Sequence, residues 1–180
     1  MSGEPGDDRE QLDYLSFVDY AVARTARELP DIDALAMRFV LTLHRATSAL
    51  VYDLESSVHR PRGLTWPGFR LLFVLWLAGP AEAKRVAELT GMSRAAVSAL
   101  VKTLEREGLV CRRQVAHDRR SVQLALTEVG RVAIADAFAA HNAREQDWVG
   151  VLSESEVVTL IGLLGKLMAG SARIAARRRS

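Results

Sequence analysis

Apolar residues recur at helical spacing along most of this 180-residue chain, and only two short runs alternate as a strand does. Those runs are residues 109–115 and 121–126, separated by the polar segment Ala116-His-Asp-Arg-Arg120. In the second run, apolar side chains at Val122, Leu124 and Leu126 are expected to face inward, as in a half-buried strand. The pattern predicts a mainly α-helical fold with one small β-hairpin whose tip is charged.

The boundaries of the helices follow from capping residues. Thr65, Ser93 and Thr127 each stand where a side chain caps a helix, and Ser153 with Glu156 forms a capping box. The expected helices run from about residue 12 to 29, from Asp31 or Asp33 to about Val58, from Thr65 to Gly79, from Glu82 to Thr90, from Ser93 to Gly108, from Thr127 to about Val149, and from Ser153 onward. In the fourth of these, Val86, Ala87 and Leu89 are expected on one inward face.

Composition places the chain among globular proteins. With 49% apolar and 26% charged residues, it is not expected to be disordered throughout. The acidic first ten residues lack the apolar stretch of a signal peptide, and the longest strongly apolar run, 71–78, is too short to cross a bilayer. A single cysteine cannot form an internal disulfide. A cytoplasmic protein with no membrane partner is therefore expected.

The middle of the chain is basic. Residues 82–120 carry 9 Lys and Arg against 5 Asp and Glu, although the whole chain has a net charge of only +2. Two short helices joined by Thr90-Gly-Met-Ser93, with a basic hairpin directly after them, have the order of a winged helix-turn-helix. Gly91 permits the tight turn, and Ser93 begins a helix whose N-terminal end suits a phosphate.

The second of these helices has a face suited to reading DNA. Its apolar stripe is Val97, Leu100, Val101 and Leu104, and the opposite face carries small and cationic side chains: Ser93, Arg94, Ala95, Ser98, Ala99 and Lys102. The hairpin adds cations at Arg112, Arg113, Arg119 and Arg120. The alternative interpretation is a small core motif with solvated arginines.

Residues 64–130 resemble the MarR family of bacterial transcriptional regulators. The motifs that carry the resemblance are Leu64-Thr-Trp-Pro, Val86-Ala-Glu-Leu, Gly-Met-Ser93-Arg-Ala-Ala-Val-Ser98, Leu104-Glu-Arg-Glu-Gly-Leu109, His117-Asp-Arg-Arg120 and Leu126-Thr-Glu-Val-Gly130. The resemblance implies a homodimer joined by the N- and C-terminal helices, with the recognition helix in the major groove. It also implies that Arg120 enters the minor groove and that Asp118 orients a neighbouring arginine.

The family architecture divides the chain into four parts. Residues 1–30 form a tail and an extra helix, 31–60 a dimerisation helix, 61–130 the winged helix-turn-helix domain, and 131–180 C-terminal dimerisation helices with a basic tail. Apolar surface on the terminal helices exceeds what one small core needs, which independently favours a dimer.

Two departures from the family pattern are visible. Ala99 stands where members usually carry an arginine, so a DNA contact is either missing or supplied by Arg94 or Lys102. Oxidation-sensing members have a reactive cysteine near the start of the first dimerisation helix, but here the single cysteine is Cys111, which is expected to be a small apolar filler of the hairpin.

One group of aromatic and basic residues suits a small organic ligand. An aromatic wall with an arginine, backed by a histidine, fits an organic anion in the crevice that family members have, and its residues are His44, Trp66, Phe69, Arg70 and Phe73. The alternative is that most of these side chains are core and that the histidines lie at a surface or interface. His44, His59, His117 and His141 show no spacing typical of a metal site, and neither a metal nor a cofactor is expected.

These observations predict a DNA-binding transcriptional regulator, a repressor that binds a palindromic operator as a homodimer and is released by a small organic ligand. The alternative is a ligand-binding or structural dimer that has lost specific DNA binding. An enzyme is not expected, since no nucleophile, base or metal set assembles.

Overall fold

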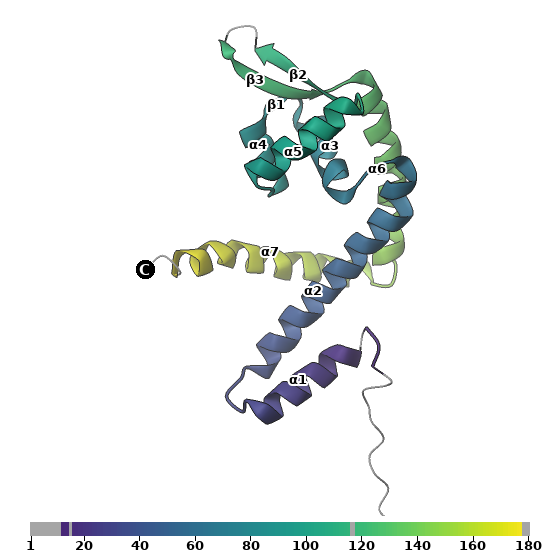
Figure 1. Ribbon diagram of the computed structural model, residues 1–180. Helices are drawn as coiled ribbons and strands as arrows, with labels where there is room; N and C mark the ends of the chain where they lie inside the picture. Colours follow the sequence, from purple (N-terminus) through teal and green to yellow (C-terminus); the bar gives the residue numbers. More distant parts are fainter. Residues whose placement is uncertain (1–11, 15, 116–117, 178–180) are drawn as a thin grey trace, which may run out of the picture. The chain divides into compact units, whose positions relative to one another are not determined.

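The computed structural model describes residues 12–14, 16–115 and 118–177, and of residues 115, 118–121 and 172–177 it describes only the backbone (Figure 1). The predicted tail 1–11, His117 and the last residues of the predicted basic tail lie outside these residues. The chain divides into two compact units, of which the first ends at Asp53 and the second begins at Leu54. Each unit is described by itself.

The first unit pairs helix α1 (Ser16–Glu28) with helix α2 (Ala34–Leu54). Arg45 of α2 donates to the carbonyl of Tyr14 over 2.6 Å, and the Tyr14 hydroxyl donates to the Arg45 carbonyl over 2.9 Å. The guanidinium also lies 3.8 Å from the Tyr14 ring centroid, and Arg38 pairs with Asp19. Of the two candidate caps for α2, Asp33 is the one whose carboxylate accepts from a helix amide, that of residue 36 at 2.9 Å.

Helix α2 ends earlier than expected. The α-helix stops at Leu54 and continues as a π-helical turn, η1 (Glu55–His59), and a 3-10 turn, η2 (Arg60–Arg62). The change of winding comes one turn before Pro61, whose ring removes an N–H and crowds the preceding turn. The expected end near Val58 is therefore wrong for the α-helix, although the chain stays helical in the wider sense.

The second unit contains the remaining elements. They are α3 (Trp66–Ala78), β1 (Ala81–Glu82), α4 (Ala83–Thr90), α5 (Arg94–Arg106), β2 (Val110–Val115), β3 (Asp118–Leu126), α6 (Glu128–Val149) and α7 (Glu154–Arg177). The strands form an antiparallel sheet in the order β1-β3-β2, with Val110 opposite Leu126 and Ala81 opposite Leu124. The mainly helical architecture with a small hairpin, predicted from the sequence, is confirmed.

The core of this unit is built from apolar side chains that α3, α4, α5, β3 and α6 each contribute. Those exposed by 1% or less are Leu71, Leu72, Val86, Val97, Val101, Leu124, Ile134 and Ala137. Because every element of the helix-turn-helix and the hairpin contributes to this core, the core fixes how these elements lie relative to one another.

Two expectations about single positions are wrong, and one short strand was not predicted. Leu89 is 42% exposed, and Thr90 is buried beside Val86 instead, because its hydroxyl is satisfied by donating to the Val86 carbonyl over 2.7 Å. On β3, Val122 is 40% exposed while Ala125 is buried, since the end of that strand contacts both α3 and α6. The two-residue strand β1 was not expected at all.

Candidate nucleic-acid interface

The turn between α4 and α5 has the geometry that the sequence predicts. Gly91 follows α4 with a φ of 70°, the left-handed conformation that glycine adopts without strain. The Ser93 hydroxyl accepts from the amide of residue 96 at 3.1 Å and so caps α5. The Thr90 hydroxyl, beside the turn, accepts from the Met92 amide at 3.3 Å. The turn is therefore fixed by its own side chains.

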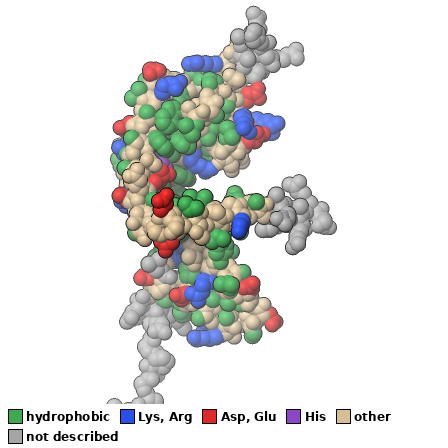
Figure 2. All heavy atoms as spheres, turned by 180° about the vertical axis from the view of Figure 1, so that it is seen from behind, with side chains coloured by type: hydrophobic (Ala, Val, Ile, Leu, Met, Phe, Trp, Pro, Cys, Tyr) green, Lys and Arg blue, Asp and Glu red, His purple; other side chains and the backbone are tan. Residues whose placement is uncertain are grey.

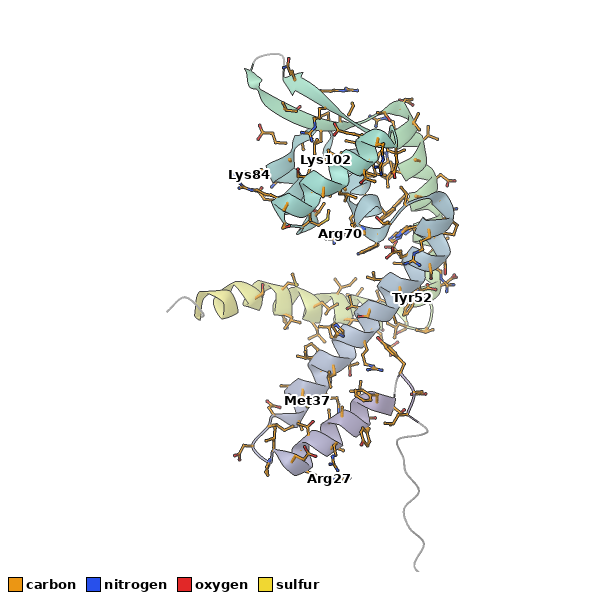
Figure 3. All side chains as sticks on the ribbon, in the orientation of Figure 1. Arg27, Met37, Tyr52, Arg70, Lys84 and Lys102 are labelled. Carbon is orange, nitrogen blue, oxygen red and sulfur yellow. The ribbon has the colours of Figure 1, made fainter. Side chains whose placement is uncertain are left out.

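Helix α5 separates an inner from an outer face. Val97, Val101 and Leu104 are buried, and Leu100 is half-buried. The predicted reading residues are all exposed: Ser93, Arg94, Ala95, Ser98, Ala99 and Lys102. Figure 3 labels Lys102 on this helix. Small side chains between two cations leave room for the helix to approach a groove, while Arg and Lys supply donors.

A hollow lies beside the turn. It has a volume of about 400 Å³ and is lined by Lys84, Ala87, Glu88, Gly91, Met92, Ser93 and Arg94. Its wall includes the N-terminal end of α5, where unpaired amides and the helix dipole favour an anion. Lys84 and Arg94 add two positive charges at this hollow and Glu88 one negative charge, so the balance favours an anion such as a phosphate.

The hairpin presents its cations unequally. Arg112 and Arg113 are both exposed on β2, but the Arg112 Nε donates to the carboxylate of Glu105 at 3.1 Å, so its charge is already paired. Arg119 and Arg120, which were expected at the hairpin tip, fall within β3 because that strand begins at Asp118. The side chains of Asp118, Arg119 and Arg120 lie outside what the structure describes.

The hairpin is joined tightly to α6. The Thr127 hydroxyl donates to the Gly108 carbonyl at 2.6 Å and accepts from the Gly130 amide at 2.9 Å, which caps α6 as predicted. The Thr127 amide donates to the Leu109 carbonyl at 3.1 Å. A Cβ at Gly130 would lie 1.9 Å from that same carbonyl oxygen, so only glycine fits.

The predicted ligand residues are only partly brought together. Trp66, Phe69 and Phe73 lie in a row on α3, with ring centroids 6.2 Å and 5.8 Å apart. With Phe138, His59 and His141 they form what we call the aromatic cluster. Phe69 is 3% exposed and belongs to the core. His44 is an exposed residue of α2 in the first unit.

Arg70 makes a contact that the sequence did not predict. Its Nη2 donates to the carbonyl of Thr90, the last residue of α4, and its guanidinium carbon lies 5.9 Å from the Trp66 ring centroid (Figure 3). The side chain therefore connects α3 to the turn of the helix-turn-helix.

A buried histidine pair lies within the aromatic cluster. His59 Nε2 and His141 Nδ1 are 3.2 Å apart, and His141 Nε2 lies 3.1 Å from Glu145 Oε1. Burial, followed by the charges of His141 and Arg62, lowers the pKa of His59 to about 4. A surface or interface location was the default expectation for the histidines and is wrong for both. For His141 a signal existed, because it continues the inward stripe of Ile134, Ala137 and Phe138 on α6.

Within the described ranges, no group of three or more His, Cys, Asp or Glu side chains is arranged to hold a metal ion. Cys111 is half-buried, opposite Ala125 in the sheet. No single described helix is both long and apolar enough to cross a membrane. Helices α6 and α7 have the length and hydropathy of a membrane span only when they are taken together, and they are bent by 103° at the break between them.

The exposed face of α5, the anion-suited hollow at its start and the adjacent hairpin together define a winged helix-turn-helix protein. A family model described as MarR family matches residues 64–122. The uncharacterized HTH-type transcriptional regulator YwaE of Bacillus subtilis is 32% identical over 133 residues, which is 73% of this chain and 77% of the relative. The chain belongs to the MarR family of DNA-binding transcriptional regulators, which are not enzymes.

Solved structures agree with this assignment. A probable transcriptional regulator from Pseudomonas aeruginosa is 26% identical and has a TM-score of 0.64, covering 72% of this chain and 96% of its own. BpsR of Bordetella bronchiseptica is 25% identical with a TM-score of 0.64, covering 71% and 96%; its structure describes regulation of DNA binding by 6-hydroxynicotinic acid. The resemblance found in the sequence is confirmed.

Proposed function

We propose that this regulator is a repressor that binds a palindromic operator as a homodimer and is released by a small aromatic anion. The observation that carries the proposal is the exposed face of α5, on which Arg94, Ser98 and Lys102 lie one turn apart in succession. Arginine and lysine donate to guanine edges in the major groove, and the small side chains between them permit close approach. The hollow at the start of α5 would receive a phosphate of the same strand.

The dimer is supported by apolar surface that the chain itself leaves uncovered. Among the side chains of α7 that the structure describes, six large apolar ones are more than 40% exposed: Val158, Leu160, Ile161, Leu163, Leu167 and Met168. Figure 2 shows hydrophobic side chains along this helix. A second copy of the chain is the partner that would cover such surface, and a two-fold dimer presents two reading helices to the two halves of a palindrome.

The ligand is supported by the chemistry around the aromatic cluster. The half-buried rings of Trp66 and Phe73 suit an aromatic molecule, and Arg70, a half-buried cation beside Trp66 that also donates to the Thr90 carbonyl, has further N–H groups that suit a carboxylate. BpsR, whose DNA binding is regulated by 6-hydroxynicotinic acid, offers a parallel in a protein of the same fold. Such a ligand acts as a releasing agent only if it binds the DNA-free arrangement more tightly than the DNA-bound one.

The reading function is tested by selecting duplexes from a random pool with the full-length protein. We expect enrichment of an inverted repeat whose half-site centres are about one helical turn, roughly 34 Å, apart. Binding to the selected site should weaken steeply with salt because phosphate contacts release counterions. A pool that yields no enriched sequence, with only salt-sensitive binding, would favour the alternative of a dimer without specific DNA recognition.

Variants on α5 test the reading face directly. Arg94→Ala should weaken binding to the selected site by about 1–3 kcal/mol or relax its base preference, as expected for a lost base contact. Lys102→Ala should act in the same direction. Arg27→Gln removes a charge from the exposed surface of α1 and serves as the control. Wild-type affinity and preference in both α5 variants would show that another element reads the DNA.

A further inference from the structure

Arg70 connects the scaffold of the second unit to the turn that precedes the reading helix. It lies on α3, half-buried, and its guanidinium donates to the carbonyl of Thr90. Thr90 ends α4 and is only 4% exposed. A Cβ placed on Gly91 would lie 3.9 Å from Nη2 of Arg70, so the guanidinium lies against the turn itself. Its other neighbour is Trp66, 5.9 Å away on the preceding turn of α3.

The contact is chemically suited to hold a helix end. The last carbonyls of an α-helix have no partner within the helix, and the negative end of the helix dipole lies there. A cation that donates to such a carbonyl makes a charge-assisted hydrogen bond, stronger and more directional than a neutral one. Arg70 thus satisfies a group that burial would otherwise leave without water.

The other contacts at the turn have a different character. The Thr90 hydroxyl, the Gly91 conformation and the Ser93 cap are local, and they fix the shape of the turn but not its place on α3. The packing of α4 and α5 on α3 is apolar, formed by side chains such as Leu72, Val86 and Val101. Apolar packing resists separation but is non-directional. The hydrogen bond from Arg70 adds a fixed direction between α3 and the turn.

We propose that Arg70 is a positioning residue for DNA reading. It holds the α4–α5 turn at one place on α3, so that the exposed face of α5 meets the base edges in a fixed orientation. It does so without touching the DNA. Sequence-specific contacts depend on sub-ångström placement of donors, whereas phosphate attraction does not, so losing this hydrogen bond should affect specific binding far more than non-specific binding.

The experiment compares full-length Arg70→Met, which keeps the apolar stem but has no donor, with Arg70→Lys, which keeps the positive charge and an N–H donor group. Arg27→Gln, on α1, controls for the loss of one positive charge. Affinity for the selected site and for a random duplex is measured across a series of salt concentrations. For Arg70→Met we expect about tenfold weaker specific binding, about unchanged non-specific binding and an unchanged salt slope. Arg70→Lys should recover most of the loss.

Amide hydrogen exchange supplies a readout that does not depend on DNA. In Arg70→Met, amides of residues 90–97 should exchange faster, while those of Leu71, Leu72 and Ile134 keep their wild-type rates. Thermal unfolding shows whether each variant folds, and Arg70→Gln takes the place of Arg70→Met if the methionine variant does not.

Four outcomes would overturn the proposal. A salt slope reduced by about 1 would mean that Arg70 contacts a phosphate. Wild-type specific affinity without the donor, or unchanged exchange at the turn, would mean that the turn keeps its place without Arg70. Equal losses of specific and random binding would indicate general damage and not loss of position.

Discussion

Gly130 lies where helix α6 passes the backbone of Leu109, and the space there admits no side chain. A Cβ at this position would lie 1.9 Å from the Leu109 carbonyl oxygen, and both groups belong to backbone, so neither a rotamer change nor a flexible tip can relieve the overlap. The beginning of α6 and the beginning of the hairpin must move apart if any larger residue is introduced.

We therefore expect Gly130→Ala to lower the free energy of unfolding by about 3 kcal/mol, at the upper end of overpacking effects. Gly162→Ala is the matched control, since Gly162 lies inside α7 with no atom within 4 Å of an added Cβ. Alanine there should be neutral or stabilising by up to about 1 kcal/mol, because it is the better helix former. Denaturant unfolding measures both, and similar values for the two variants would contradict the close approach.

The hydrogen-bond partners of His59 and His141 determine which ring nitrogens carry a proton. His141 Nε2 faces the carboxylate of Glu145 and therefore carries a proton, which leaves its Nδ1 as an acceptor for the proton of His59 Nε2. His59 Nδ1 is then an acceptor, and it is the buried side-chain atom without a partner among the described residues. Protonating the His59 ring would place an N–H at its Nδ1 with no acceptor among the described residues.

Acid should consequently destabilise the fold through His59. Its pKa is lowered from 6.5 to about 4 in the folded chain, so between these values the unfolded chain binds more protons and stability falls as the pH falls. The loss from this group between pH 7.5 and pH 5 is about 2 kcal/mol. His59→Phe should lose this part of the acid dependence, whereas His44→Gln, at an exposed position, should keep it. Identical pH profiles for wild type and His59→Phe would refute the assignment.

Among the elements, the helices were the more predictable. The caps at Thr65, Ser93, Thr127 and Ser153 were identified from the sequence because a cap depends on residues within three positions of it. Strand β1 was missed because two residues show no period, and it exists only through pairing with β3, more than 40 positions away. The burial of Ala125 was missed for the same reason: tertiary contacts cover both faces of that strand.

Two substitutions in the hairpin test whether it contacts the minor groove of DNA. Arg120→Ala should weaken specific binding markedly and random binding less, with the larger effect at sites flanked by A·T pairs, where a narrow minor groove attracts an inserted arginine. Asp118→Ala should also weaken binding if Asp118 orients a neighbouring arginine, as the family resemblance implies, because the loss of such a charge-assisted hydrogen bond would loosen the hairpin. Gel shifts on the selected site and on a random duplex measure these effects. Tighter binding by Asp118→Ala would mean that the hairpin acts only as a basic surface.

For the whole molecule, the apolar surface of α7 predicts the oligomeric state. We expect sedimentation at micromolar concentration to show a dimer, and Leu167→Glu to weaken it, because Leu167 is 41% exposed and would carry a charge into the contact. Lys102→Glu changes a charge on the reading face of α5 and should leave the dimer intact. A stable wild-type monomer would contradict both the dimer and the palindromic operator.

The parts of the site that depend on residues close together in the sequence could be predicted, whereas the contacts between residues far apart in the sequence could not. The division of α5 into a buried and an exposed face needs only helical periodicity, so the exposure of the proposed reading residues was predicted from the sequence. His59 and His141 are 82 positions apart, and Arg70 reaches a carbonyl 20 positions away. The spacing of residues within one helix does not predict such contacts, because they depend on how α3, α4 and α6 pack around one core.

The hydrogen bonds and close packing at Thr127 and Gly130 couple the first turn of α6 to the base of the hairpin. With 22 residues the helix is about 33 Å long, and a tilt of roughly 5° about its first turn would carry its far end through about 3 Å. Since the same first turn is bonded to the backbone at Gly108 and Leu109, the hairpin must follow that tilt. A displacement at the distant end of α6 would therefore reach the base of the hairpin, and because Ile134 and Ala137 of the same helix are buried in the core, the core would have to adjust with it.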